Sequence, residues 1–444
     1  MSNSPQDSAG NTSFPPHPKL FAELRGERYI NLEKDTQYSD AWVTLALVVT
    51  ILGIIFSNLF LTAAALTLLV IAAISRSWNA LSLFGLYYRR QFSETRAFMG
   101  ETIALTLEVR NQKFLPLTWL RVSDVFPATL PLQESKVDFN QFSNLGEFRS
   151  FWILGAFQRI TRHFTIECTH RGYHSYGPAT LRTGDGFGLF GNRAILPGEQ
   201  RIIVYPRIYS AAELRIPAKN PFGERKSERR LFEDPLRAQG IREWQPGDSL
   251  KRVHWKATAR HRQLLSRLYE PSEEPQTLIF LNVATMRRHW QGVYPELLER
   301  TISVAGSLAA LSLEQRTPTG LIANGAFPGS DQPLRLLPGR GADQLTRILE
   351  MLAAVNNFAS RPIEEHLLRE APRLPWGATI VVVTAIAHDE LLLALADLRK
   401  AGRALVLFTL AEAPPKSLNE QIGIPVYHLP HLVDDIVAPN EMKI

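Results

Sequence analysis

The chain has little of what secreted proteins and common enzyme families carry. Its 444 residues include one cysteine, Cys168, so no disulfide can form within a chain. A single cysteine fits a reducing compartment, and we expect Cys168 to be a small buried apolar side chain. The HEXXH, nucleophile-elbow and Walker motifs are also missing, which leaves no basis for a hydrolase or ATPase mechanism. Zinc-finger spacing and RNA-binding aromatic patterns are missing too, so a nucleic-acid partner is not expected.

Charged residues are missing from one long apolar stretch. No Asp, Glu, Lys or Arg occurs between Ala41 and Ser75. One membrane-spanning helix needs about 20 residues, so a single straight helix of this length would overshoot the bilayer. Two short spans fit if the chain turns at Ser57–Asn58. We therefore predict a transmembrane helical hairpin over residues 41–76, with spans at Ala41–Phe56 and Leu59–Ile74.

Basic residues flank this hairpin on both sides and are absent from its turn. They are Arg25, Arg28 and Lys34 before it and Arg76, Arg89, Arg90 and Arg96 after it. The positive-inside rule then places both termini in the cytoplasm, as in a two-pass protein of the inner (cytoplasmic) membrane. Residues 1–40 are predicted to be a disordered cytoplasmic segment, because Ser, Pro, Asn and Gln dominate its first half.

The next part of the chain has the alternation of half-buried strands. An amphipathic linker is expected over residues 77–95, with a helix around Trp78 to Gln91. Over residues 96–208, alternating apolar runs separated by Gly, Pro, Asn and Asp predict an antiparallel β-sandwich-like domain. The glycine-rich segment from Gly184 to Gly191 lacks the GxxxxGK[ST] spacing, so a tight turn is favoured over a phosphate loop.

Residues 275–444 change to alternating strands and helices. Apolar runs at residues 277–283, 320–325, 379–386 and 403–410 suit buried parallel strands, and helices are predicted at Pro295–Glu314, Ala342–Val355 and His388–Ala401. This order predicts an α/β open sheet of the Rossmann type. A ligand site in such a sheet would lie at the carboxyl ends of its strands, near Asn282, Thr384 and Leu410.

Positive charge is concentrated between the two soluble parts. The formal net charge is +6, and Arg201 to Glu270 alone holds 16 Lys or Arg against 8 Asp or Glu. Such a patch could face anionic lipid or an acidic protein. A solvated loop from Glu224 to Arg230 is the simpler alternative.

A motif with fixed spacing lies within this basic region. Residues 240–270 read GIREWQPGDSLKRVHWKATARHRQLLSRLYE, and this stretch resembles the signature of the DUF58 proteins of bacteria and archaea. The positions that carry the resemblance are Arg242, Gly247, Asp248, Arg252, His254, Trp255, Ala259 and Arg260. An upstream segment carries a second match at Arg171, Gly172, Gly177, Pro178, Asp185, Gly188 and Phe190.

The resemblance implies a membrane-anchored, multidomain protein. Residues 275–444 would form a von Willebrand factor A-like domain, and residues 209–274 would be a signature linker or docking segment. Metal-binding domains of this type carry Asp-x-Ser-x-Ser after the first strand, completed by a threonine and an aspartate. The matching positions here are Asn282, Ala284 and Met286, which offer an amide, a methyl and a thioether.

Hard dications bind anionic or hydroxyl oxygens, which this triad lacks. We therefore predict a degenerate metal site with no metal and no cofactor. Thr285 or Thr384 could support a weak remnant of it.

The signature is interpreted as structural, with no catalytic residue. Asp248 is expected to cap a packed element that contains Val253, Trp255 and Ala257. The signature arginines, namely Arg242, Arg252 and Arg260, are expected to bridge the two soluble domains.

Three functional hypotheses follow. The first is a non-enzymatic, membrane-tethered cytoplasmic scaffold for protein interaction. For this scaffold the resemblance implies a MoxR-type AAA+ ATPase and a transglutaminase-like membrane protein as partners. The second is an enzyme or small-ligand-binding protein that uses Asp248 and His254. The third is a lipid or cell-envelope assembly factor that uses a basic patch made of Arg225, Lys226, Arg229 and Arg230.

Overall fold

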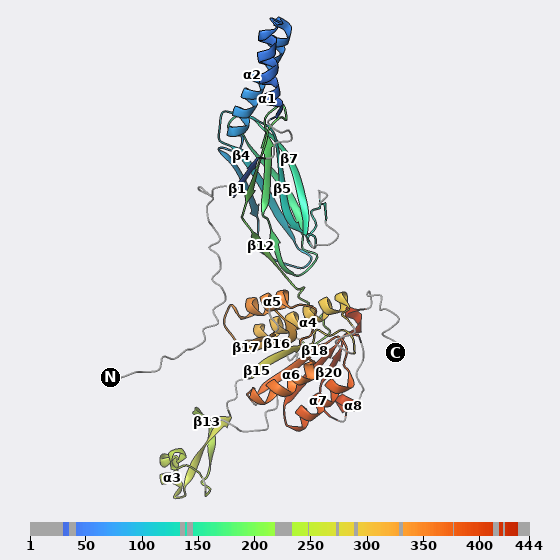
Figure 1. Ribbon diagram of the computed structural model, residues 1–444. Helices are drawn as coiled ribbons and strands as arrows, with labels where there is room; N and C mark the ends of the chain where they lie inside the picture. The colour runs from blue at the N-terminus through green and yellow to red at the C-terminus, as the bar shows by residue number, and fades with distance from the viewer. Residues whose placement is uncertain are drawn as a thin grey trace, which may run out of the picture.

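The computed structural model describes most of the chain in three folded parts and a pair of helices (Figure 1). The described residues are 30–34, 41–133, 138–139, 145–217, 233–246, 248–271, 275–287, 292–327, 332–375, 377–411, 417–420 and 422–433. Of the segment predicted to be disordered, residues 1–29 and 35–40 lie outside these ranges, as does the predicted basic patch at residues 225–230.

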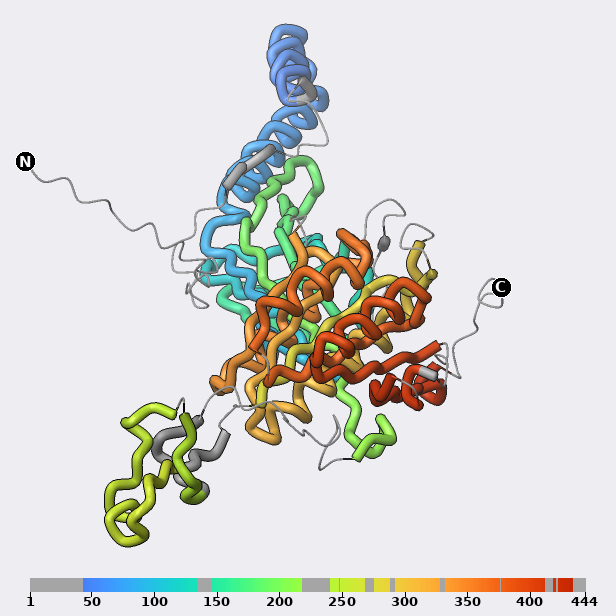
Figure 2. Tube along the Cα trace, turned by 90° about the horizontal axis from the view of Figure 1, so that it is seen from below, coloured from blue at the N-terminus to red at the C-terminus, as the bar shows by residue number. Residues whose placement is uncertain are grey.

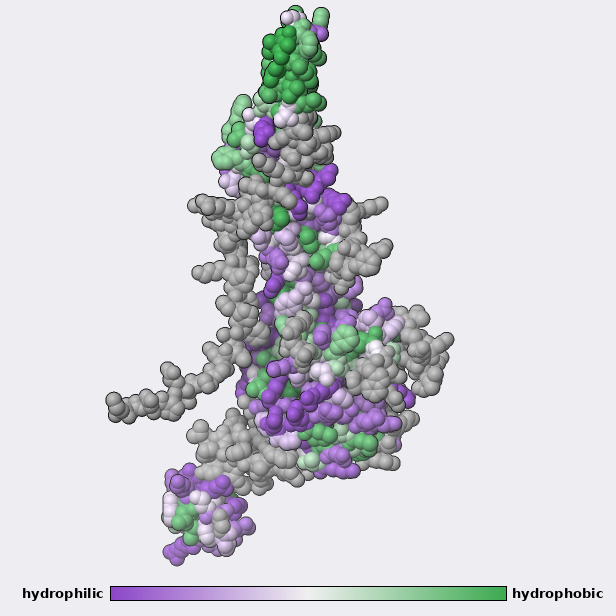
Figure 3. Space-filling model, viewed as in Figure 1, coloured by the Kyte–Doolittle hydropathy of each residue, from purple (hydrophilic) through white to green (hydrophobic). Residues whose placement is uncertain are grey.

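Two apolar helices lie side by side at one end of the molecule (Figure 1). Helix α1 spans Ala41–Ile55 and α2 spans Leu59–Ser82. Ser57 adopts a φ of 52° in the turn, and the side chain of Asn58 accepts a hydrogen bond from Leu61 N at 3.1 Å to cap α2. Both helices expose aliphatic side chains (Figure 3). Helix α2 is long and apolar enough to cross a membrane.

The linker expected at residues 77–95 is only partly helical. Helix α2 continues past Ile74 to Ser82, and Gly85 then turns the chain with a φ of 63°. The expected helix around Trp78 to Gln91 is wrong beyond this point, because Leu86–Phe92 forms strand β2. The sequence LYYRRQF alternates buried and exposed side chains and pairs antiparallel with β4.

A β-rich domain follows, called here the β domain (residues 86–205). Its strands after β2 are β3 (Arg96–Phe98), β4 (Thr102–Asn111), β5 (Leu117–Pro127), β6 (Asp138–Phe139), β7 (Leu145–Leu154), β8 (Arg159–Glu167), β9 (Gly172–Tyr176), β10 (Ala179–Gly184), β11 (Gly191–Leu196) and β12 (Gln200–Tyr205). Together with β2 and the edge strand β1 (Ile30–Lys34), they form sheets of order β1-β11-β10-β5-β7-β6, β2-β4-β8 and β3-β12-β9. Alternate side chains of β4, β5 and β7 fill one apolar core with Trp152 at its centre.

One edge of the six-stranded sheet of the β domain is formed by a segment that was expected to be disordered. Strand β1 (Ile30–Lys34) pairs antiparallel with β11, which corrects that prediction for these residues. A short alternating segment gains backbone hydrogen bonds when it covers an unpaired edge strand, a benefit that composition does not reveal.

A buried ion pair joins two sheets of the β domain. Arg90 of β2 contacts Asp124 of β5 at 2.7 Å, and Tyr88 donates its phenolic hydrogen to the same carboxylate at 2.8 Å. Arg90 also donates to the carbonyl of Gly198. The carboxylate is fully buried, so its hydrogen bonds hold the sheets together at this point. Cys168 is buried as expected, and burial raises the pKa of its thiol to about 11.

The α/β domain (residues 275–433) is a sheet covered by helices on both faces (Figure 1). Its elements are β15 (Gln276–Leu281), α4 (Pro295–Glu314), β16 (Thr319–Ala326), β17 (Pro333–Gly339), α5 (Gln344–Ala354), α6 (Ile363–Glu370), β18 (Ala378–Thr384), α7 (Asp389–Lys400), β19 (Ala404–Thr409), α8 (Ser417–Glu420) and β20 (Val426–His428). The strand order is β17-β16-β15-β18-β19-β20, with β17 antiparallel and the others parallel. Helices α4 and α5 pack on one face, and α6 and α7 pack on the other.

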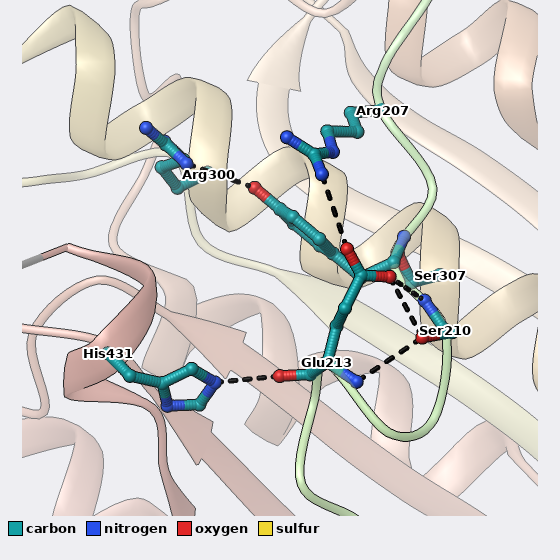
Figure 4. A network of polar contacts seen from close by, with 7 residues as sticks. Arg207, Ser210, Glu213, Arg300, Ser307 and His431 are labelled. Carbon is teal, nitrogen blue, oxygen red and sulfur yellow. Dashed lines mark hydrogen bonds and ion pairs between the residues drawn. The ribbon is translucent and has the colours of Figure 1, made fainter.

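The segment after β12 fastens the chain to the α/β domain. Tyr209, together with Leu214 and Ile216, is buried in the same core as α4. Figure 4 shows the polar contacts around this segment: Ser307 of α4 accepts from Tyr209 N at 2.7 Å, and His431 Nε2 lies 2.7 Å from the carbonyl oxygen of Glu213. This segment is therefore part of the α/β domain's packing.

Candidate functional site

The signature residues form a small projecting lobe, called here the lobe (residues 233–271). Strands β13 (Glu233–Glu243) and β14 (Leu265–Pro271) pair antiparallel. The 3-10 helix η1 (Leu250–Arg252) and helix α3 (Trp255–His261) lie between them. Figures 1 and 2 both show the lobe apart from the α/β and β domains.

Asp248 holds the turn of the lobe together. Its carboxylate accepts from Arg242 at 2.7 Å and from the backbone N–H of Gln245 at 3.0 Å. These hydrogen bonds, that from Arg242 first, lower the pKa of Asp248. Asp248 therefore stabilises the turn after β13. The expectation that Asp248 caps a helix is wrong. Gly247 lies outside the described residues.

His254 is the residue that caps α3. Its Nδ1 accepts from the backbone N–H of Ala257 at 3.1 Å, and Thr258 Oγ1 accepts from Leu265 N at 3.1 Å. The described contacts include no hydrogen bond between His254 and Asp248. The two side chains thus serve different backbone turns, and they do not form an acid–base pair.

Trp255 is on the surface of the lobe, where a packed position was expected. It is 66% exposed, whereas Val253 is buried and forms an isolated bridge with Ser266 of β14. Because α3 begins directly after that bridge, its first residue points away from the strands. Three other apolar side chains of the lobe are also well exposed: Ile241, Leu250 and Leu264.

Arg171 is a buried arginine that joins the β domain to the α/β domain, a role that was expected of the signature arginines. Arg242 pairs with Asp248 inside the lobe, and Arg252 and Arg260 lie on the same projecting lobe (Figure 2). Arg171, just before β9, donates from one nitrogen to the carbonyls of Leu352, Ala353 and Val355 at 3.1, 3.2 and 3.1 Å. It thereby supplies positive charge and hydrogen bonds to the carbonyl end of α5.

Glu299 of α4 completes this contact. The carboxylate lies 2.9 Å from Arg171 Nε, and the Arg171 side chain is 5% exposed. Burial lowers the pKa of Arg171, whereas Glu299 raises it. Burial also raises the pKa of Glu299, against the effect of Arg171. Around the pair, Tyr205 packs against Leu349 and Ala353 in a small apolar cluster, so the two domains share a real interface.

The carboxyl ends of the central strands carry a buried amide network in place of a metal shell. Asn282 donates to Thr384 Oγ1 at 3.0 Å and accepts from Asn324 Nδ2 at 2.9 Å. Asn324 also accepts from Val283 N at 2.8 Å, and Thr285 accepts from Tyr294 N at 2.7 Å. Asn324 was not predicted as a site residue from sequence. A polar residue near the end of the buried apolar strand β16 was a signal that could have identified it.

These hydrogen bonds occupy the oxygens that a remnant metal site would need. Ala284 supplies only its backbone N–H, which donates to Asn282 Oδ1 at 3.1 Å, and Met286 is partly buried. Within the described residues no cluster of three or more His, Cys, Asp or Glu side chains has metal-binding geometry. The network therefore fixes the strand ends to one another.

We expect calorimetry of the full chain to show no saturable heat with Mg²⁺ or Mn²⁺. A neutral amide network offers neither net charge nor a free oxygen to a hard dication. Asn282→Asp adds one carboxylate and is the matched control for weak binding. Tight binding by the natural chain that is lost in Asn282→Ala would contradict this prediction.

Comparison with known proteins agrees with the signature. The family model described as "Protein of unknown function DUF58" matches residues 240–386, which contain most of the lobe and the strand ends of Asn282, Asn324 and Thr384. The chain is also similar to "Uncharacterized protein YeaD" of Bacillus subtilis (strain 168). The two are 23% identical over 316 residues, which cover 69% of this chain and 72% of that protein. These matches support the DUF58 resemblance.

Solved structures share only limited similarity with the chain. A CARDB domain from Pyrococcus furiosus matches with 10% identity and a TM-score of 0.18, over 27% of this chain and 91% of that one. A non-cellulosomal cohesin from Archaeoglobus fulgidus matches with 13% identity and a TM-score of 0.17, over 29% and 95%. Scores this low carry no argument about fold or function.

Proposed function

We propose that this protein is a non-enzymatic, membrane-tethered scaffold whose lobe docks a partner protein in the cytoplasm. The apolar surface of α1 and α2 supports a two-pass anchor in the inner membrane. The doubly wound strand order, with β17 antiparallel at one edge, supports a von Willebrand A-like α/β domain that has lost its metal ligands.

The exposure of Trp255 on the lobe carries this proposal. Tryptophan is enriched among the few residues that dominate binding energy at protein interfaces, where it fills a pocket on the partner. Asp248 and His254, the lobe's candidates for chemistry, are already hydrogen bonded to backbone groups and hold the lobe's shape. This use of both side chains favours docking over the alternative of an enzyme or ligand-binding site.

Charge indicates what kind of partner surface fits the lobe. Residues 240–270 contain seven Lys or Arg against three Asp or Glu. A basic rim around an exposed tryptophan complements an acidic surface with an apolar pocket, and it would speed association at low salt. Among the partners implied by the DUF58 resemblance, we propose a MoxR-type AAA+ ATPase first and a transglutaminase-like membrane protein second.

Trp255→Ala is expected to weaken binding of the purified MoxR-type ATPase from the same organism by about 30-fold. This factor corresponds to the loss of an interface hot spot of about 2 kcal/mol. Interferometry with the full chain in detergent gives the dissociation constants. Phe358→Ala is the matched control, since Phe358 is 77% exposed but lies on the α/β domain. Equal affinities for both variants would contradict docking through the lobe.

A further inference from the structure

A cavity of about 360 Å³ lies where α2 meets the β domain. Helix α2, strand β5 and the turn after β10 supply its lining, which consists of Ile74, Ser75, Trp78, Thr118, Asp185, Gly186 and Phe187. Ser75 is the last residue of the uncharged stretch, and Arg76 follows it. If α2 spans the bilayer, the cavity lies at the depth of the lipid glycerol and ester groups.

Two hydrogen-bond donors in this cavity have no partner. Ser75 Oγ and Trp78 Nε1 are buried and make no hydrogen bond, and Ser75 is 1% exposed. Buried polar groups are nearly always paired, so an unpaired donor at a cavity wall points to a missing acceptor. A ligand that brings oxygen atoms would satisfy both groups.

The acceptor in the lining is already satisfied. The Asp185 carboxylate accepts from Phe187 N at 2.9 Å and from Phe190 N at 2.7 Å, and the Asp185 carbonyl accepts from Trp119 Nε1 at 3.1 Å. These bonds fix the glycine-rich turn, in agreement with its prediction as a tight turn. Asp185 therefore positions the turn and leaves the cavity with free donors.

The rim of the cavity is apolar. Ile74 is 51% exposed and Phe187 is 66% exposed, on two elements that face one cavity. An occupant must therefore present hydrocarbon to Ile74 and Phe187 and oxygen acceptors to Ser75 and Trp78. Glycerophospholipids have this combination, with ester oxygens next to the acyl chains, and tryptophan N–H groups favour this interfacial depth.

We propose that the cavity binds one phospholipid through its glycerol-ester region, with an acyl chain along Ile74 and Phe187. Such binding rests on the proposed membrane tether and adds a specific lipid site to it. None of the described lining residues is Lys, Arg or His, so the proposed contacts are to ester oxygens and not to a charged headgroup. The occupant proposed is a zwitterionic phospholipid, with phosphatidylethanolamine as the probe.

Native mass spectrometry of the full chain, stripped of lipid in detergent and titrated with phosphatidylethanolamine, tests the site. The Ser75→Ala/Trp78→Phe double variant removes both donors without adding atoms. Because two hydrogen bonds are lost, the first lipid is expected to bind to this variant at least about tenfold more weakly than to the natural chain. Ser77→Ala is the control, since Ser77 is exposed and bonds its own helix at Ala73. Equal first-lipid affinities in all three proteins would overturn the proposal, as would tighter binding of phosphatidylglycerol.

A carbonate wash of native membranes separates this proposal from the tether. We expect the natural chain and the double variant both to stay in the membrane, since two hydrogen bonds contribute little to an anchor made of whole helices. Release of the natural chain would refute the tether itself. Retention of both proteins with equal lipid affinities would refute the lipid site alone.

Discussion

Replacing Asp124 by alanine is expected to destabilise the β domain by about 3–5 kcal/mol, because it leaves the Arg90 charge buried without its counterion. Burial raises the pKa of Asp124 to about 6, and Arg90 opposes this rise without cancelling it. The pair therefore costs desolvation energy, which the attraction between the two charges and their hydrogen bonds offset. Thermal unfolding of the full chain, followed by tryptophan fluorescence, gives the loss as a lower transition temperature.

The neighbouring exposed pair of the same domain is the control for Asp124→Ala. Glu108 contacts Arg159 at 2.7 Å, but the arginine side chain is 61% exposed. Solvent screening limits such a pair to about 0–1 kcal/mol, so Glu108→Ala should leave the transition almost unchanged. Similar losses in the two variants would mean that the Arg90–Asp124 contact does not hold the sheets together.

Arg171→Ala is expected to separate the β domain from the α/β domain. It removes an ion pair and three hydrogen bonds, and it leaves Glu299 and the carbonyl end of α5 without their partner. Breaking a buried pair costs about 3–5 kcal/mol. If protease cleavage follows the opening of the interface, cleavage of the connecting segment at residues 206–217 should become at least about 100-fold faster. Limited proteolysis of the full chain measures this rate.

A second ion pair crosses the same interface and serves as the control. Arg96 contacts Glu350 at 2.8 Å, with 47% of the arginine side chain exposed. Arg96→Ala is expected to change the cleavage rate by less than about fivefold, as for an exposed pair. An unchanged rate in Arg171→Ala would show that apolar contacts around Tyr205 alone hold the domains together.

Regular elements with strong local signals could be predicted from sequence. Helix α4 matches its predicted limits, Pro295–Glu314, because proline at its first position and a long helical run define it locally. Strands β4 and β5 follow clear alternation between polar and apolar residues. Both features depend on neighbours within one element, which a sequence shows directly.

Features that depend on distant partners could not be predicted. Strand β1 exists because β11, about 160 residues away, offers an open edge, and β2 forms because β4 accepts it. The role of Arg171 could not be predicted for the same reason. Arg171 was matched by the DUF58 resemblance, but its role depends on contacts with α4 and α5. For Trp255, alternation with Val253 indicated packing, whereas α3 begins at Trp255 and changes the period of the side chains.

The pairing of β13 with β14 has a consequence for how the family can change over time. Because Glu233 pairs with Pro271, the lobe's two ends lie next to each other at its base. The lobe can therefore be exchanged for that of a relative as a single cassette, without repacking the α/β core. Selection on partner choice and selection on folding would then act on separate parts of one gene.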